Sequence, residues 1–294
     1  MSTASLEPRE VNDQVTSQDP IFSIEHVTLR FGGVTSLDDV SLALERDSIL
    51  AVIGPNGAGK TSLFNCLTGV YRPQVGTILF TARGRAPKRI GSMRPYRVNR
   101  LGVARTFQTS RMFGAMTAFE NVKIGVESTQ RTGPIGATLR LPRTLREERE
   151  GDVRALQLLE FVGLTSRAND VSESLPYGDR RRLEIARALG TNPEVLLLDE
   201  PAAGANPAEK RALGELITRV RSELGVSILL IEHDMKLVMS IAERIIVLNF
   251  GRIIAEGTPA EIQRSPVVVD AYLGTSHAAP EASAAGEPDA GEAP

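Results

Sequence analysis

The 294-residue sequence predicts an α/β fold with a largely parallel central sheet. Short, continuous apolar runs at 49–54, 195–199 and 227–231 suit strands that are buried on both faces. Segments with helical periodicity alternate with these runs. In addition, a glycine-rich loop at 54–61 joins the first run to a helical segment, which is the order of a phosphate-binding unit.

The N-terminal part is expected to begin with strands at 21–31 and 40–44, because both segments combine β-type spacing with β-branched residues. Asp38 and Asp39 are expected to form the turn before the second of these strands. The elements expected next are the strand at 49–54, a helix at 61–69 that ends at Gly69, a turn at 73–76 and a short strand at 76–80.

In the C-terminal part, the segment 206–224 carries the strongest helix signals. Asn206 suits the N-cap, Pro207 the first helical position, and Glu209 completes a capping pattern. Its expected apolar stripe comprises Leu213, Leu216, Ile217, Val220 and Leu224. The other elements expected here are a helix at 151–162 with an apolar face of Val153, Leu156, Leu159, Phe161 and Val162, a helix at 179–189, the strands at 195–199 and 227–231, and a hairpin at 244–257 that turns at Phe250–Gly251.

The composition is that of a globular protein. Hydrophobic residues make up 41% of the chain and charged residues 24%, which excludes collagen-like, disulfide-rich and wholly disordered proteins. The single cysteine, Cys66, cannot form an internal disulfide. The apolar runs are far shorter than the roughly 18 residues of a membrane span, and the N-terminus lacks the apolar segment of a signal peptide. We therefore expect a chain that does not cross a membrane by itself.

Charge divides the chain into three parts. Residues 1–20 carry a net charge of −3 and residues 275–294 a net charge of −4, so the total of −2 leaves +5 on residues 21–274. The last segment is rich in Ala, Pro, Glu and Gly and has too few large apolar groups to fold. Both ends are therefore expected to be disordered tails.

Residues 81–119 form a basic stretch that contains no acidic residue. Its nine basic residues are Arg83, Arg85, Lys88, Arg89, Arg94, Arg97, Arg100, Arg105 and Arg111. A solvated face is the simplest interpretation, and an anionic membrane surface or an acidic partner is the next. Nucleic-acid binding favours interleaved aromatic residues, whereas Tyr96, Phe107 and Phe113 are irregularly spaced.

The segment GPNGAGKT at 54–61 matches the phosphate-loop pattern G-x-x-x-x-G-K-[ST]. Its three glycines allow the backbone to wrap around phosphate groups at the start of a helix. Lys60 can reach the β- and γ-phosphates, and the hydroxyl of Thr61 can bind Mg²⁺. A glycine-rich turn with an exposed lysine is the simpler alternative, but the strand before the loop and the helix after it favour nucleotide binding.

Acidic residues and a histidine follow two of the predicted buried strands. Asp199 and Glu200 end the run VLLLDE, at the edge where α/β sheets bind ligands. Asp199 suits a Mg²⁺ ligand, and Glu200 could orient and deprotonate an attacking water. His233 follows the next strand and could contact a γ-phosphate, although a structural role is the simpler interpretation of this residue alone.

Together these motifs resemble the ATP-binding-cassette (ABC) ATPases over about residues 21–274. Gln108 stands at the family's Q-loop position, and Leu175–Asp179 stands at its signature position. Further segments are similar to the ATP-binding subunits of branched-chain amino-acid importers: LPYGDRRRLEIARAL, LDEPAAGANP, LLIEHDMKLVM and DAYLG. The chain departs from the family pattern at Pro176 and Tyr177 in the signature and at Ala205, where a leucine is expected.

The resemblance implies a P-loop ATPase fold, the ABC nucleotide-binding domain. It implies an N-terminal antiparallel β region and an inserted α-helical subdomain at about 111–187. The ATP-binding domain would then cover 21–274, between disordered tails at 1–20 and 275–294.

The resemblance also implies ATP and Mg²⁺ as cofactors, with Glu200 and His233 as the catalytic residues. Phe31 would stack on the adenine ring. The full set of implied ATP-binding residues is Phe31, Gly54, Pro55, Asn56, Gly57, Ala58, Gly59, Lys60, Thr61 and Ser62. The implied Mg²⁺ ligands are Thr61, Gln108 and Asp199, and the implied signature residues, which would act on the ATP of a second subunit, are Tyr177, Gly178 and Asp179.

The function expected from this resemblance is ATP hydrolysis that powers solute import, with branched-chain amino acids as the solute. The implied partners are a second ATP-binding subunit in a homodimer or heterodimer, transmembrane permease subunits and, indirectly, an extracytoplasmic solute-binding protein, with no nucleic acid. The expected location is the cytoplasmic face of the cell membrane, as a peripheral protein. Two alternatives remain open: the ATPase of a urea or short-chain amide importer, and a soluble ABC ATPase that acts on nucleic acid. A GTPase is disfavoured because the chain has no N-K-x-D segment.

Overall fold

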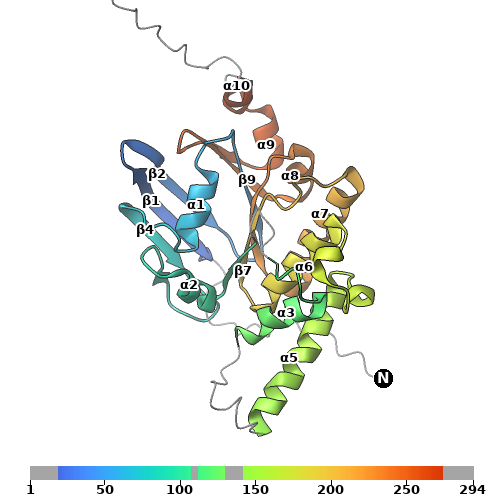
Figure 1. Cartoon of the computed structure of the whole chain (residues 1–294). Coiled ribbons are helices and arrows are strands. Elements are labelled where there is room, and N and C mark those ends of the chain that lie inside the picture. The colour runs from blue at the N-terminus through green and yellow to red at the C-terminus, as the bar shows by residue number, and fades with distance from the viewer. Residues whose placement is uncertain (1–18, 107–111, 130–141, 274–294) are drawn as a thin grey trace, which may run out of the picture.

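The computed structural model describes residues 19–106, 112–129 and 142–273 (Figure 1). Gln108 lies outside these residues, and so do both predicted tails except for residues 19 and 20. The described part of the chain forms two sheets with helices between and around them, which confirms the predicted α/β class.

A four-stranded antiparallel sheet forms the N-terminal part, in the order β2-β1-β4-β5. Its strands are β1 (Phe22–Phe31), β2 (Val34–Leu44), β4 (Val75–Phe80) and β5 (Lys88–Arg89). Phe22 of β1 pairs with Leu44 of β2 on one side and with Phe80 of β4 on the other. The antiparallel β region implied by the family resemblance is therefore present, and β2 starts earlier than expected.

The predicted turn at Asp38–Asp39 is wrong, because both residues lie inside β2. The chain turns instead at Gly32, whose φ of +56° suits glycine. The two aspartates lie where the register between β1 and β2 is irregular. There Asp39 has a φ of +55°, and its carboxylate lies 2.7 Å from Nδ1 of His26. The polar pair thus marks a β-bulge, which offers unpaired polar positions much as a turn does.

A six-stranded sheet forms the centre of the molecule, in the order β10-β9-β3-β8-β7-β6. Its strands are β3 (Ile49–Ile53), β6 (Val103–Arg105), β7 (Val195–Asp199), β8 (Ser227–Ile231), β9 (Arg244–Asn249) and β10 (Arg252–Gly257). All pairings are parallel except that of β10 with β9. The predicted strands at 49–54, 195–199 and 227–231 and the hairpin turn at Phe250–Gly251 are confirmed.

Both faces of the central sheet are covered, which explains why its strands are continuously apolar. Leu50 and Val52 of β3 pack with α1 (Lys60–Leu67) and the antiparallel sheet, so α1 lies between the two sheets (Figure 1). Leu196 and Leu198 of β7 point to the opposite face. The helices that pack on that face are α3 (Ala118–Glu127), α5 (Pro142–Phe161), α6 (Tyr177–Gly190) and α7 (Pro207–Leu224).

Shorter helices complete the described structure. A third apolar cluster joins β3 and β9 to α8 (Met235–Ile241), α9 (Pro259–Arg264) and α10 (Pro266–Leu273). The remaining helical elements are α2 (Pro95–Leu101) and the 3₁₀ turns η1 (Thr165–Arg167) and η2 (Ser172–Ser174). None of the helices within the described ranges has both the length and the hydrophobicity that a membrane crossing requires.

The two helices with the clearest sequence patterns had different outcomes. For α7, the predicted cap is confirmed: Asn206 accepts the N–H groups of Ala208 and Glu209, and the Glu209 carboxylate accepts the N–H of Asn206. For α5, part of the predicted apolar face is wrong, since Val153 and Leu156 are exposed. The predicted Leu159, Phe161 and Val162 are buried, together with Ala155 and Leu158, because this face meets α3 and α6.

Candidate functional site

The loop at 54–61 connects β3 to α1 and has the conformation of a phosphate cradle. Gly54, Gly57 and Gly59 all have positive φ, at +148°, +80° and +104°. A Cβ atom at Gly54 would lie 2.1 Å from the carbonyl oxygen of Leu248, so the backbone there tolerates no side chain. At Gly57 nothing lies within 4 Å of such an atom, so the loop is open on that side.

The first turn of α1 faces the interior of this loop. Gly59 is the N-cap of α1 and makes no side-chain capping bond, so the first backbone N–H groups of the helix are available to an anion. Thr61 is exposed beside them, and the Ser62 hydroxyl accepts a 2.7 Å hydrogen bond from Ser36 of β2. The remaining loop residues differ in exposure: Asn56 is exposed, Pro55 is half-buried and Ala58 is buried.

Lys60 is buried, and its ammonium folds back over the loop. Its Nζ donates to the carbonyl oxygens of Gly54 at 2.7 Å and Pro55 at 2.9 Å. Burial lowers the pKa of Lys60, and the negative charges of Glu200 and Asp199 partly oppose this effect. The buried ammonium is therefore held near two carboxylates at the mouth of the loop.

Adjacent parallel strands bring the other candidate residues to the same edge. The sheet order places β8 between β3 and β7, so the carboxyl ends of these strands are neighbours. Asp199 ends β7 and Glu200 follows it. The Glu200 N–H donates to the carbonyl oxygen of Ile231 in β8, which keeps the two strand ends together. Glu200 has a φ of +47°, a conformation that is strained for a residue with a side chain.

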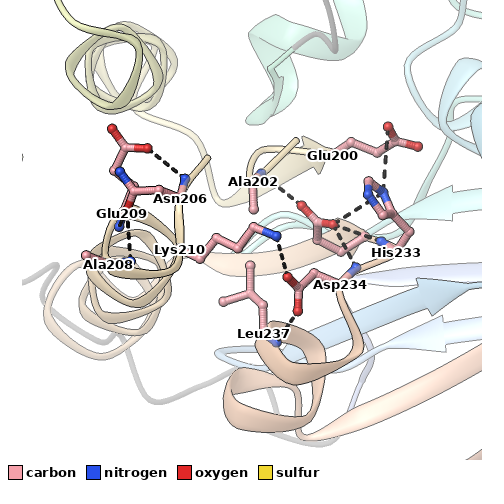
Figure 2. Close-up of polar contacts among 10 residues, drawn as sticks. Glu200, Ala202, Asn206, Ala208, Glu209, Lys210, His233, Asp234 and Leu237 are labelled. Carbon is pink, nitrogen blue, oxygen red and sulfur yellow. Dashed lines mark hydrogen bonds and ion pairs between the residues drawn. The ribbon is translucent and has the colours of Figure 1, made fainter. Parts of the chain in front are cut away.

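His233 lies next to Glu200 beyond the end of β8. Its Nδ1 is 4.0 Å from a carboxylate oxygen of Glu200, and the side chain is 61% exposed. Figure 2 shows the imidazole ring beside the Glu200 carboxylate. The same Nδ1 lies 3.7 Å from a carboxylate oxygen of Glu232. The imidazole therefore faces the space beside Glu200 and is accessible to a ligand.

Glu232 is a site residue that the sequence reasoning missed. Its buried carboxylate accepts the N–H groups of Ala202 at 2.8 Å, His233 at 2.8 Å and Asp234 at 3.2 Å. These bonds connect the turn after Glu200 to the segment that carries His233. The signal available in the sequence was an acidic residue directly after a buried strand, which is the same signal that identified Asp199.

Arg105 is a second residue whose place the sequence did not indicate. It ends β6, and its guanidinium forms a 2.7 Å ion pair with Asp199, both side chains being less than a tenth exposed. The same guanidinium donates to Oδ1 of Asn65 in α1 at 2.7 Å and lies over the ring of Phe64. One member of the basic stretch is thus buried and holds Asp199, instead of lying on a solvated face.

The donor atoms at this edge of the sheet suit a cation that takes most of its ligands from a bound phosphorylated molecule and from water. Within the described ranges, no group of three or more His, Cys, Asp or Glu side chains could hold a metal ion. The Thr61 hydroxyl and the Asp199 carboxylate are hard oxygen donors of the kind Mg²⁺ uses together with phosphate oxygens and water. The residues therefore fit a metal that arrives with a phosphorylated ligand.

Phe31 lies at the end of β1, and its ring is 46% exposed. It packs edge-on against Tyr71, with 5.0 Å between ring centroids. An exposed aromatic face held by a neighbouring ring is available for stacking.

The signature-position residues lie at the start of α6. Pro176 is the N-cap of this helix. The Tyr177 hydroxyl donates to the carbonyl oxygen of Ala203 and accepts two hydrogen bonds from Arg181. A Cβ atom at Gly178 would lie 3.0 Å from Oε1 of Glu209, and Asp179 pairs with Arg182. The N-terminus of α6 is thus packed against the turn at 201–205 and the start of α7.

The structure does not bring the signature residues to the phosphate loop. Helix α1 packs on one face of the central sheet, and α6 packs on the other. Lys60, Asp199, Glu200 and His233 therefore form one site, while the N-terminus of α6 forms a separate surface. Gln108 lies outside the described residues.

Comparison with protein families gives two matches. A family model described as "ABC transporter" matches residues 37–203. A second model, described as "Branched-chain amino acid ATP-binding cassette transporter", matches residues 252–278. The first covers the phosphate loop, the signature position and the end of β7, and the second covers the C-terminal part from β10 onward.

Curated relatives match the chain over nearly their whole length. The high-affinity branched-chain amino acid transport ATP-binding protein LivG of Salmonella typhimurium is 46% identical over 87% of this chain and 98% of its own. BraF of Pseudomonas aeruginosa, which carries the same description, has the same identity and coverage. A probable LivG protein of Archaeoglobus fulgidus is 34% identical over 86% of this chain and 95% of its own.

Solved structures support the same assignment. A nucleotide-free ATP-binding cassette from an ABC transporter superposes with a TM-score of 0.74 at 30% identity, covering 86% of this chain and 99% of that one. The ADP conformation of an ABC-transporter cassette gives a TM-score of 0.75 at 30% identity, covering 87% and 99% of the two chains. The two sheets and the helices around them are thus those of a nucleotide-binding cassette.

Proposed function

The chain belongs to the ABC transporter family as an ATP-binding subunit, and we propose that its ATP hydrolysis drives the import of branched-chain amino acids through separate membrane subunits. The observation that carries the solute is the match to branched-chain amino acid transport proteins at 46% identity over 98% of their length. The family match at residues 252–278 supports it independently of the ATP site.

In this proposal, the loop at 54–61 binds the phosphates of ATP. The open side of the loop at Gly57 and the uncapped start of α1 would receive them. The ammonium of Lys60 would turn from the carbonyl oxygens of Gly54 and Pro55 toward the phosphate oxygens. Phe31 would stack on the adenine ring, and the remaining loop residues and Ser62 would shape the pocket.

Hydrolysis requires a group that accepts a proton from the attacking water. We assign this role to Glu200, whose carboxylate stands at the carboxyl end of β7 in a strained backbone conformation. His233, 4.0 Å away, would contact the γ-phosphate and hold the water in line. Mg²⁺, held by Thr61, Asp199 and Gln108 together with phosphate oxygens, would supply charge neutralisation.

A second subunit would complete the site. The start of α6 packs on the opposite face of the sheet from α1, so one copy cannot offer both surfaces to the same ATP. In a head-to-tail dimer, the backbone at Tyr177, Gly178 and Asp179 would face the γ-phosphate bound by the partner. This partner would be a second copy of the chain or a related ATP-binding subunit.

The remaining assignments follow from the same family. The subunit would lie on the cytoplasmic face of the cell membrane, held by permease subunits that receive solute from an extracytoplasmic binding protein. The helices within about 111–187 would form the subdomain that contacts the permease. Residues 1–20 and 275–294 would be solvated tails around the ATP-binding domain at 21–274.

Uptake of labelled leucine, isoleucine and valine in cells tests this function. Replacing the chromosomal copy with Lys60→Ala should abolish uptake of all three, whereas Lys236→Ala, which changes an exposed lysine on α8, should not. Normal uptake in the Lys60→Ala strain would refute the solute assignment. If the Lys60→Ala strain instead loses uptake of urea or of a short-chain amide, the chain is the ATPase of that alternative importer.

A further inference from the structure

The segment from β4 to the end of α2 forms an exposed basic surface. Six basic side chains on it are exposed: Arg85, Lys88, Arg89, Arg94, Arg97 and Arg100. Within the described part of the chain, none of the six forms an ion pair, in contrast to neighbouring Arg83, which pairs with Asp47. We call these six residues the α2 basic surface.

Local contacts hold this surface together. Arg72 donates to the carbonyl oxygen of Ser92, which ties the end of the α1–β4 connection to the start of α2. Arg89 donates to the Thr77 hydroxyl across the β4–β5 pair. The positive charges are therefore carried by a folded edge of the molecule, and they face solvent without neutralising carboxylates.

An aromatic ring lies in the first turn of α2. Tyr96 is half exposed, and the guanidinium groups of Arg97 and Arg100 lie 5.8 and 6.0 Å from its ring centroid. Arg97 also donates to the Tyr96 hydroxyl at 3.0 Å. An exposed tyrosine between arginines is a combination typical of surfaces that meet lipid headgroups, where tyrosine is enriched.

The α2 basic surface borders the groove between the central sheet and the helices α3 and α6. Asn99 of α2 lines a cavity of about 330 Å³ together with Phe113, Gly125 and Arg187. In the proposed function, the helices within about 111–187 contact the membrane subunits. The side of the molecule that carries the α2 basic surface would then face the membrane.

We propose that the α2 basic surface binds the anionic lipid headgroups of the membrane on which the transporter assembles. This inference rests on the proposed membrane location but not on the identity of the solute. Cytoplasmic loops of membrane proteins carry an excess of Lys and Arg, so they would repel this surface, whereas an anionic leaflet complements it. Nucleic acid is a weaker fit, because one tyrosine flanked by arginines offers no run of stacking rings.

Vesicle flotation of the purified full-length chain tests the proposal. Binding to vesicles with about 30% phosphatidylglycerol in phosphatidylcholine should exceed binding to pure phosphatidylcholine at least tenfold, since each basic residue contributes about fivefold. The difference should disappear at about 1 M salt. The test variant is Arg94→Glu, Arg97→Glu and Arg100→Glu combined, which should lose the preference for anionic vesicles.

A matched control carries the same change in charge on other faces. Arg211→Glu, Lys236→Glu and Arg264→Glu alter exposed residues of α7, α8 and α9 and should retain binding within about twofold. Both triple variants should hydrolyse ATP like the wild type, which shows that they fold and separates this test from that of the proposed function. Equal loss in the two variants, or no preference for anionic vesicles, would overturn the proposal. Binding of a single-stranded RNA through Arg94, Arg97 and Arg100 without vesicle binding would also overturn it and indicate a nucleic-acid surface.

Discussion

Among individual residues, Arg105 connects the candidate metal ligand to the rest of the molecule. Its guanidinium is held between Asp199, Asn65 and the ring of Phe64, and it has almost no contact with water. A buried ion pair adds little net stability when intact, but removing one partner leaves an uncompensated charge. Arg105 therefore holds the Asp199 carboxylate in place at the end of β7.

Replacing Arg105 with methionine tests this role. Because the Asp199 carboxylate would lose its buried partner, we expect the free energy of unfolding to fall by about 3–5 kcal/mol in urea denaturation. Arg146→Met, which breaks an exposed pair with Glu150, should change it by no more than about 1 kcal/mol. Similar small effects of both substitutions would mean that Asp199 does not depend on Arg105.

Asp234 introduces a dependence of stability on pH. The Lys210 ammonium, 2.6 Å away, and then the Leu237 N–H hold the pKa of Asp234 below its ordinary value (Figure 2). Since the carboxylate is favoured in the folded state, its stabilisation is present above the unfolded pKa of about 3.9 and is lost as the pH falls through the folded pKa.

Unfolding of Asp234→Asn as a function of pH should reveal this contribution. The variant should be less stable than the wild type at neutral pH, and the difference should shrink as the pH falls below about 4. Lys210→Met should show the same pattern, because it removes the other partner. A difference that stays constant down to acid pH would contradict the assigned pKa shift.

Among the secondary-structure elements, the start of α6 is held by the turn that follows β7. The Tyr177 hydroxyl donates to Ala203, while Glu232 at the end of β8 binds Ala202. Asn206 then caps α7 directly after the turn. Tyrosine replaces a family glycine here, and its side chain joins the signature helix to the turn behind Glu200.

Tyr177→Phe keeps the aromatic ring and removes this hydroxyl. The Ala203 carbonyl and Arg181 would each lose a hydrogen-bond partner, so we expect kcat for ATP hydrolysis to fall about tenfold, the effect of roughly one hydrogen bond. The KM for ATP should change less than about twofold, because the ring and backbone remain. Tyr96→Phe is the control, since its hydroxyl bonds only to neighbouring Arg97 among the described residues. An unchanged kcat would show that the turn does not need Tyr177.

The secondary-structure elements differ in whether they could be predicted from the sequence. Strands β3, β7 and β8 were predictable because burial on both faces makes them continuously apolar, and α7 because its capping box is complete. Short elements such as α2, β6 and α8 were missed because they contain too few residues to show a period. The predicted burial of Val153 and Leu156 was wrong, because helical spacing shows that residues share a face but not that another element covers that face.

The site was predictable in its phosphate loop and its strand-end acids, because these depend on local order along the chain. Glu232 carries the same strand-end signal, but its contacts could not be assigned from that signal, and Arg105 carries no such signal. Their roles come from contacts with Ala202 and Asp199, which lie 30 and 94 residues away in the sequence. Such long-range partners are set by the order of strands in the sheet, which no local pattern encodes.

In the whole molecule, the central sheet separates two functional surfaces. One face carries α1 and the phosphate loop, and the other carries α6 with the signature position. In the proposed head-to-tail dimer, a single chain would provide half of each of two composite ATP sites. The net charge of −2 also conceals an unequal distribution, because the α2 basic surface lies in a body of charge +5 between acidic ends.

The most direct test of this arrangement is ATP hydrolysis and dimer formation by Glu200→Gln, compared with Glu223→Gln in an exposed pair on α7. With Mg²⁺ and ATP, Glu200→Gln should form a stable dimer and hydrolyse ATP about 10²–10⁴-fold more slowly, because it binds the nucleotide but lacks the base. Glu223→Gln should behave as the wild type. Hydrolysis by Glu200→Gln at the wild-type rate would contradict the account, and so would failure of ATP to dimerise it.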